Sequence, residues 1–254
     1  KALAQSCDVY FYQVGQRLGI DRLAWYAKAA GLGSRTGIEL DHEGSGLVPT
    51  AAWKKKRTGI PWQPGETLSV AIGQGFNLVT PLQMAVFTAA VANGGVRYRP
   101  TLVKQVTSWD GEIIVRNDPQ KAGRLPVSPA TLDLVRKGLW EVVQGERGTA
   151  RIARLKDIDI SGKTGTAQVV SREKIEESEE GATAHHYKDH AWFVAYAPSE
   201  APRIAIAVIV EHGEHGSSTA SPVARELIKT YLQEVPDDPG DPVRAERAGE
   251  SGNG

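Results

Sequence analysis

The stretch ISGKTGTAQVV, residues 160–170, places a lysine between two glycines and then continues with β-branched residues. Gly162-Lys163-Thr164 is compatible with the end of a phosphate-binding loop, Gly-x-x-x-x-Gly-Lys-Ser/Thr. That motif would need a first glycine at Asp157, whose charge would repel phosphate, and it should open a helix. We therefore exclude a phosphate loop and predict a strand that carries a cation and two hydroxyls.

Two more strands are predicted after this segment. HAWFVAYAP at 190–198 and RIAIAVIVEH at 203–212 are rich in β-branched and aromatic residues, and the short turn PSEAP joins them. So short a connection fits an antiparallel meander, since parallel strands need a long crossover. The polar segment 171–189 is predicted to be a long loop, and Ser221-Pro222 to begin a final helix.

The first half of the chain is predicted to be rich in helices. Residues 2–17 carry helix formers, and Asp21 is expected to cap a second helix that Gly31 ends. Residues 31–79 are rich in Gly and Pro and predict long loops with short helical turns. The basic run at 53–59 predicts a solvated face or loop.

Two later helices carry clear start signals. Thr80, Pro81 and Gln83 have the pattern of a capping box with proline at the first helical position. Ser128-Pro129 begins another helix, and Asp110-Gly111 is predicted to be the turn of a hairpin between the two. The pattern as a whole predicts an α/β fold of the α+β type, with an antiparallel sheet flanked by helices and a helix-rich half.

Composition indicates a globular protein with no general affinity for nucleic acid or membrane surfaces. The 254 residues are 41% hydrophobic, and 30 basic residues balance 30 acidic ones. Since Cys7 is the single cysteine, no disulfide can form within the chain. The chain begins without Met and in the middle of a pattern, so we expect it to be a piece of a longer protein.

Two motifs far apart in the chain belong to a known set. Ser6-Cys7-Asp8 stands near the start and Lys163-Thr164-Gly165 on a late strand, and β-lactamases and penicillin-binding proteins combine Ser-x-x-Lys, Ser-Asp-Asn and Lys-Thr-Gly. Over about residues 1–233 the chain resembles the transpeptidase domain of class B penicillin-binding proteins, nearest to those of cell elongation. The segments that carry the resemblance, in order, are SCDVYFYQVGQRLGIDRL, GIPWQPGETLSVAIGQG, TPLQMA, GTA, SGKTGTAQV and DHAWFVAYAP.

The resemblance implies a β-lactamase/transpeptidase-like fold and an acyl-transfer site. Ser6 would pass protons across a cleft to and from Lys163, whose charge would serve both this relay and the carboxylate of the substrate. Asp8 would orient the site or a substrate amide, although many relatives have Asn at this position.

The same resemblance assigns substrate binding to the strand around Lys163. The hydroxyls of Thr164 and Thr166 would hydrogen-bond the substrate carboxylate, and the Thr166 N–H would be one oxyanion donor. Gly165 has no side chain, so the substrate could lie along the strand edge as an added strand.

The nucleophilic serine is expected upstream of Lys1, together with the first strands of the sheet and the helix that bears it. The chain contains one Ser-x-x-Lys, at Ser171 and Lys174, but it follows Lys-Thr-Gly and lies in a charged segment, so we interpret it as unrelated. We therefore expect this chain alone to be inactive.

No cofactor is needed for the implied chemistry. Cys7 is either an ordinary thiol or, as in some elongation relatives, a zinc ligand that acts with upstream residues. His185, His186 and His190 lack metal-ligand spacing, and we interpret them as free loop histidines.

The implied function is that of a peptidoglycan D,D-transpeptidase that cross-links D-Ala-D-Ala stem peptides during elongation and is a target of β-lactams. The alternative is a penicillin-binding sensor or a non-catalytic scaffold of the same fold. The implied location is the bacterial inner membrane, with the domain in the periplasm. Expected partners are a membrane glycosyltransferase and other elongation proteins. Residues 1–235 would belong to the domain, and residues 236–254 would be a disordered tail.

Overall fold

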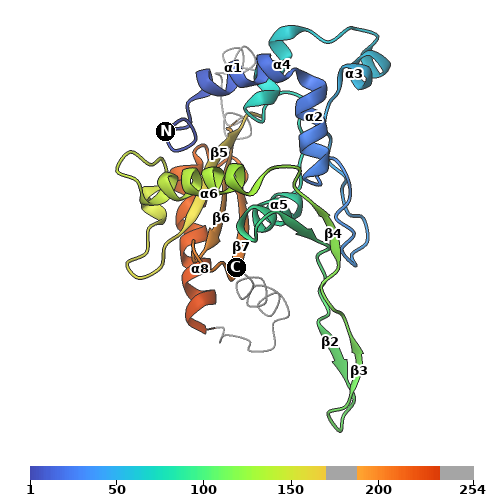
Figure 1. Ribbon diagram of the computed structural model, residues 1–254, viewed down its shortest axis with the longest axis vertical. Coiled ribbons are helices and arrows are strands. Elements are labelled where there is room, and N and C mark those ends of the chain that lie inside the picture. The colour runs from blue at the N-terminus through green and yellow to red at the C-terminus, as the bar shows by residue number, and fades with distance from the viewer. Residues whose placement is uncertain (170–187, 235–254) are drawn as a thin grey trace, which may run out of the picture.

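The computed structural model describes residues 1–169 and 188–234. A helix-rich half comes first, and a three-stranded sheet with a closing helix comes last (Figure 1). The elements are α1 (Asp8–Leu18), α2 (Ile20–Ala29), α3 (Ala51–Thr58), α4 (Pro64–Ala71), α5 (Pro81–Ala92), β1 (Val96–Tyr98), β2 (Gln105–Thr107), β3 (Ile113–Arg116), β4 (Lys121–Arg124), α6 (Pro129–Gln144), a 3₁₀ turn (Arg151–Ala153), β5 (Ser161–Ala167), β6 (His190–Ala197), β7 (Ile204–Val210), a π-helical turn (Gly216–Ala220) and α8 (Ser221–Glu234).

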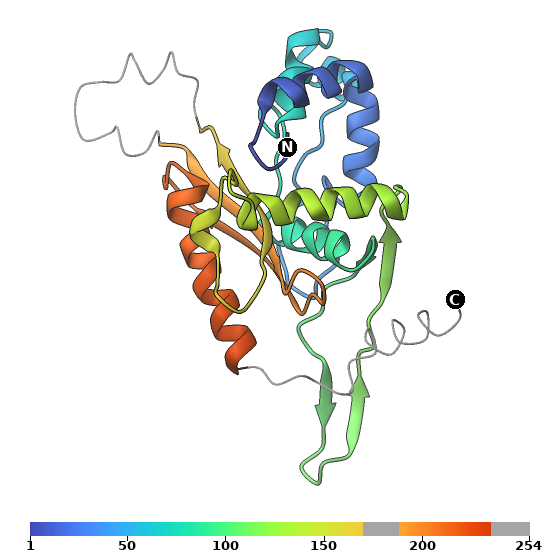
Figure 2. The ribbon, with the colours of Figure 1, turned by 60° about the vertical axis from the view of Figure 1, so that its left-hand side comes forward.

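The late strands form the predicted antiparallel meander in the order β5-β6-β7. Lys163 pairs with Val194, and Phe193 pairs with Val208, without a register shift along either ladder. Helices α5 and α8 lie on opposite faces of this sheet (Figures 1 and 2). Among the described residues, β5 has a strand partner on one side only. Its other edge, the free edge, pairs with no strand and is contacted by the Gln74 side chain.

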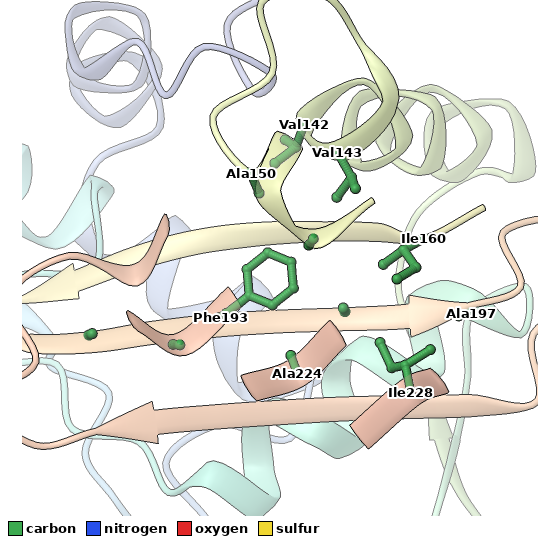
Figure 3. Close-up of a cluster of buried hydrophobic side chains, with 12 residues drawn as sticks. Val142, Val143, Ala150, Ile160, Phe193, Ala197, Ala224 and Ile228 are labelled. Carbon is green, nitrogen blue, oxygen red and sulfur yellow. The ribbon is translucent and has the colours of Figure 1, made fainter. Parts of the chain in front are cut away.

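The core lies between the sheet, α8 and the end of α6 (Figure 3). The Phe193 side chain of β6 points into this core. It packs in one cluster with Ile160, Val143 and Ile228, and all four side chains are fully buried. Alternation along β6 places Ala191, Phe193, Ala195 and Ala197 in the same layer. This apolar layer holds β5 in place and therefore supports the strand that carries Lys163.

The capping and hairpin predictions are confirmed. The Thr80 hydroxyl oxygen accepts a hydrogen bond from the Gln83 N–H at 3.1 Å, and Gln83 Oε1 accepts one from the Thr80 N–H at 3.0 Å. Asp110 and Gly111 form the tip of the β2–β3 hairpin, with Gly111 at φ 89°. This hairpin projects away from the rest of the molecule (Figure 2).

Two helix starts differ from the predictions. The first helix begins at Asp8 rather than at residue 2, because Ser6 has a φ of 50°, a left-handed conformation that a right-handed helix cannot contain. Asp21 does not cap the second helix, whose N-cap is Gly19. The Asp21 carboxylate instead accepts a hydrogen bond from the Ala51 N–H at 3.1 Å and so holds the start of α3.

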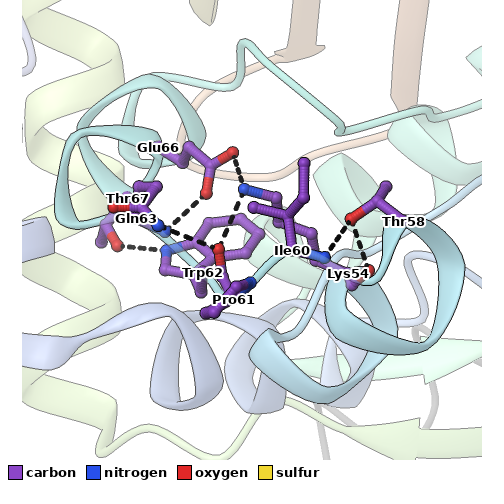
Figure 4. A network of polar contacts seen from close by, with 8 residues as sticks. All are labelled: Lys54, Thr58, Ile60, Pro61, Trp62, Gln63, Glu66 and Thr67. Atoms are coloured by element: carbon purple, nitrogen blue, oxygen red, sulfur yellow. Dashed lines mark hydrogen bonds and ion pairs between the residues drawn. The ribbon is translucent and has the colours of Figure 1, made fainter.

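Most of the basic run at 53–59 is the predicted solvated face, since residues 55–59 are exposed on helix α3 and at its end, but Lys54 is different. Lys54 is buried, forms an ion pair with Glu66 and donates to the Pro61 carbonyl at 3.2 Å (Figure 4). Trp62 lies beneath the Lys54 ammonium, with 5.9 Å between the nitrogen and the ring centroid. The loop predicted for residues 31–79 thus contains two eight-residue helices, α3 and α4, joined by this network.

Some predictions fall outside the described residues. These are most of the loop at 171–189, including Ser171, Lys174, His185 and His186, and the tail at 236–254. In residues 1–169 and 188–234, no helix combines the length and the apolar character needed to cross a membrane.

Candidate active site

The structure brings Ser6 and Lys163 together although 157 positions separate them in sequence. The Lys163 ammonium donates to Ser6 Oγ at 2.5 Å and to the Thr164 carbonyl at 2.8 Å. Ser6 comes from the turn before α1, and Lys163 comes from the middle of β5. The two motifs that sequence analysis paired are therefore in direct contact across two layers of the fold.

The position of Ser6 depends on a bent backbone and on close helix packing. Its left-handed φ of 50° turns the chain just before α1 begins, a conformation that costs a non-glycine residue about 1–3 kcal/mol. Gly15 then lets α1 approach α4, since a Cβ on Gly15 would lie only 2.6 Å from the Ala71 Cβ. The α1–α4 contact and the turn together set where the Ser6 hydroxyl points.

The charge of Lys163 is tuned by burial. Burial lowers the pKa of Lys163 from 10.5 to about 8, and the nearby negative charge of Asp8 opposes part of that shift. Asp8 is exposed in the first turn of α1. At neutral pH the lysine is mostly a cation but can lose its proton at moderate cost, which suits both carboxylate binding and proton transfer to Ser6.

Thr149 is a site residue that sequence analysis did not single out. Its hydroxyl lies 3.4 Å from the Thr164 hydroxyl, and Thr164 Oγ1 is also 3.4 Å from the Lys163 ammonium. The sequence signal for Thr149 was the tripeptide GTA at residues 148–150, which was part of the family resemblance but to which no function was assigned. The loop that presents Thr149 needs Gly148, since a Cβ there would lie 2.2 Å from the Val142 carbonyl oxygen.

Gly165 and Thr166 lie on the half-buried outer part of β5. A Cβ on Gly165 would lie 3.1 Å from the Trp192 Cβ, so the glycine also relieves crowding against β6. The Thr166 carbonyl accepts a hydrogen bond from Gln74 Nε2 at 2.6 Å. Gln74 lies between two glycines, Gly73 and Gly75.

Cys7 is exposed and forms no disulfide. Within the described part of the chain, no group of three or more His, Cys, Asp or Glu side chains is placed to hold a metal ion. The residues present do not fit a zinc site at Cys7, and His190 interacts instead with the backbone N–H of His212 at 3.0 Å.

Comparisons with known proteins agree with this geometry. Residues 1–229 match the family model of the penicillin-binding protein transpeptidase domain. Among curated relatives, the peptidoglycan D,D-transpeptidase MrdA of Haemophilus influenzae is 38% identical over 237 residues, which are 92% of this chain and 36% of the relative.

Solved structures of PBP2 proteins have the same fold. The structure of Pseudomonas aeruginosa PBP2 in complex with WCK 5153 has a TM-score of 0.75 and 39% identity, covering 94% of this chain and 49% of that one. The complex of PBP2 and MreC from Helicobacter pylori has a TM-score of 0.74 and 33% identity, covering 92% of this chain and 39% of that one. The chain thus spans about a third to a half of the length of these proteins.

Proposed function

Because this chain belongs to the penicillin-binding protein transpeptidase family, we propose that the protein containing it is a peptidoglycan D,D-transpeptidase of the PBP2 type. The observation that carries the proposal is the contact between Ser6 Oγ and a Lys163 ammonium of lowered pKa, beside the free edge of β5. Acyl transfer needs a proton relay, a cation and an edge for the acyl donor, and these residues supply all three.

In the proposed reaction, a serine outside this chain attacks the carbonyl carbon of the penultimate D-Ala. Its proton leaves through the relay, the C–N bond to the terminal D-Ala breaks, and that amine departs with a proton. Ser6 passes the proton, and Lys163 holds Ser6 in place by the hydrogen bond at 2.5 Å. Asp8 lies close enough to raise the pKa of Lys163 and thereby favours the cationic form. The amine of a second stem peptide then attacks the ester and reverses the proton path.

The acyl donor binds along β5. The carboxylate of the terminal D-Ala is held by the Lys163 charge and by the hydroxyls of Thr164 and Thr166, and Thr149 orients the Thr164 hydroxyl. The Thr166 N–H donates to the developing oxyanion. Gly165 keeps this part of the edge free of a side chain, so the donor backbone can pair with it.

The rest of the proposal follows the family. The domain comprises residues 1–235, the whole protein is anchored in the bacterial inner membrane, and the domain lies in the periplasm. A glycosyltransferase and an MreC-like protein are its proposed partners, since one structural relative forms a complex with MreC. β-Lactams would acylate the same serine because they mimic the acyl donor.

The test uses the whole protein that contains this domain. We expect a fluorescent penicillin to form a covalent adduct, and D-Ala-D-Ala stem peptides to be cross-linked with release of D-Ala. Adduct formation without release of D-Ala would favour a sensor of the same fold. Failure to form any adduct would contradict a penicillin-binding function altogether.

A further inference from the structure

Gln74 interacts with the same edge of β5 that is proposed to bind the acyl donor. Its Nε2 donates to the Thr166 carbonyl at 2.6 Å, and its Oε1 accepts from the Gln168 N–H at 3.3 Å. One side-chain amide therefore engages a carbonyl and an N–H two residues apart, as the N–H and C=O of a single residue do in a parallel ladder. These contacts join positions 92 and 94 residues apart in sequence.

The turn that presents Gln74 is built for this position. Gly73 and Gly75 have φ values of 81° and 71°, a region that glycine enters without strain. The Gln74 N–H donates to the Ser69 carbonyl at 2.9 Å, and Asn77 Nδ2 approaches the Gln74 carbonyl at 3.4 Å. The side chain is half-buried, so it extends from a turn that is held by hydrogen bonds at its own backbone.

The geometry of the free edge of β5 shows that Gln74 takes the place of part of an added strand. In a strand, the N–H and C=O of one residue point to the same side, so both groups of Thr166 lie on the free edge. A residue of an added antiparallel strand would exchange two hydrogen bonds with Thr166, one to each group. Gln74 occupies the carbonyl and also the next N–H along the edge, that of Gln168. Since a single side-chain amide reaches both, it lies where the added strand would continue.

We infer that Gln74 is a positioning residue that ends the docking edge at Thr166 and competes with the amide N–H of the acyl donor for the Thr166 carbonyl. This inference rests on the proposed function, because it takes the edge of β5 as the donor site. The Thr166 N–H stays available to the reacting carbonyl, while the donor backbone beyond that residue must displace Gln74 or leave the edge. Gln74 thereby selects against donors that depend on a second backbone hydrogen bond.

The experiment compares two acylating probes on the whole protein. Benzylpenicillin carries an amide N–H on the carbon next to its reacting carbonyl, whereas a penem carries a hydroxyethyl group and no amide at that carbon. In Gln74→Ala the Thr166 carbonyl is released, so the ratio of acylation rates, benzylpenicillin over penem, should rise about threefold to tenfold, the range for one net hydrogen bond. Gln74→Asn is the matched variant, since its amide is one methylene too short to reach the edge, and it should raise the ratio similarly.

The outcomes separate this inference from the proposed function. A raised ratio in both variants supports competition at the edge. A ratio that stays equal to that of the wild type, with both rates lowered alike, would show that Gln74 only braces the cleft and would overturn the inference. Wild-type protein that is acylated by neither probe would refute the proposed function, and the inference with it.

Discussion

The charge of Lys163 is the feature on which acylation should depend most. Lys163→Ala removes the cation and the hydrogen bond to Ser6, and Lys163→Met removes the same charge while keeping an unbranched stem in the half-buried site. We expect both variants to lose acylation by penicillin. The fold should survive, because burial has already lowered the pKa of Lys163. A buried ammonium of lowered pKa does not stabilise the folded state at neutral pH, so its loss carries no electrostatic cost.

The size of the expected rate loss follows from the interaction between the Lys163 cation and the carboxylate of a bound substrate. Two unit charges about 4 Å apart interact by about 4 kcal/mol at an effective dielectric constant of about 20, which corresponds to about a 10³-fold change in rate. Removal of one preorganised polar group from an active site typically costs about 10²–10³ in rate. We therefore expect Lys163→Ala and Lys163→Met to acylate about 10²–10³ times more slowly than the wild type.

The wild type should show the same dependence as a function of pH. With a pKa of about 8, Lys163 is about 90% protonated at pH 7 and about 10% at pH 9. If the cation drives acylation, the rate should fall about tenfold between these values. The folded-state pKa of Lys163 lies below the ordinary lysine value of 10.5, so folding stability should rise rather than fall as pH increases from about 8 to 10.5. A lower acylation rate at pH 9 would therefore not result from unfolding caused by deprotonation of Lys163.

The assay is covalent labelling of the whole protein by penicillin, followed by intact mass over time at each pH. Thermal unfolding of each variant is the control for folding. Acylation of Lys163→Met within a few fold of the wild-type rate would contradict a role for the Lys163 charge. A wild-type rate that stayed constant or rose from pH 7 to pH 9 would contradict it equally.

Three further predictions concern stability. Burial raises the pKa of Glu66, but the hydrogen bonds from Lys54 and the Gln63 N–H, together with the charge of Lys54, outweigh this effect and keep the pKa below 4.5. The pair should therefore stabilise the fold above pH 4.5 and lose that contribution as pH falls through the lowered pKa. Glu66→Gln should cost about 1–3 kcal/mol at pH 7 by denaturant unfolding, less than the roughly 3–5 of a fully buried pair because Glu66 is 26% exposed; an unchanged midpoint would contradict this. Gly162→Ala should cost about 1–3 kcal/mol, since its Cβ would lie 2.7 Å from the Phe193 ring and the Val194 carbonyl. The control Gly65→Ala, which meets nothing within 4 Å, should leave the thermal midpoint equal or raised. Cys7→Ser should change stability by less than about 0.5 kcal/mol and leave the metal content of the purified protein unchanged, because Cys7 is exposed; loss of bound zinc in that variant would return Cys7 to the role of a ligand.

Much of the fold could be predicted because local patterns report on local backbone. The alternation in residues 190–198 and 203–212 predicts strands whatever they pair with, and the short turn between them leaves antiparallel pairing as the simple solution. Thr80 and Gln83 predict a helix start because the two hydrogen bonds of a capping box lie within one turn. The order of the motifs was sufficient to indicate the family.

Local patterns were least informative where a contact with a residue distant in sequence fixes the position of a side chain. Lys54 lies in a run of basic residues that predicts exposure, yet it is buried because Glu66 and Trp62 come to it from the next loop and helix. Asp21 has the composition of a cap but bonds to the start of α3. Such contacts depend on how helices pack, and the sequence of one segment does not predict that packing.

Residue patterns alone predict the strand around Lys163, the helices with capping signals and the pairing of Ser6 with Lys163 as motifs. The folded arrangement was needed to find the left-handed backbone of Ser6, the position of Thr149 beside Thr164, and the contact of Gln74 with the edge of β5. The physical reason is the range of the interactions. Capping and alternation act over a few residues of one segment, whereas the pKa of Lys163 and the contacts of Gln74 arise where helices and a sheet distant in sequence exclude water between them.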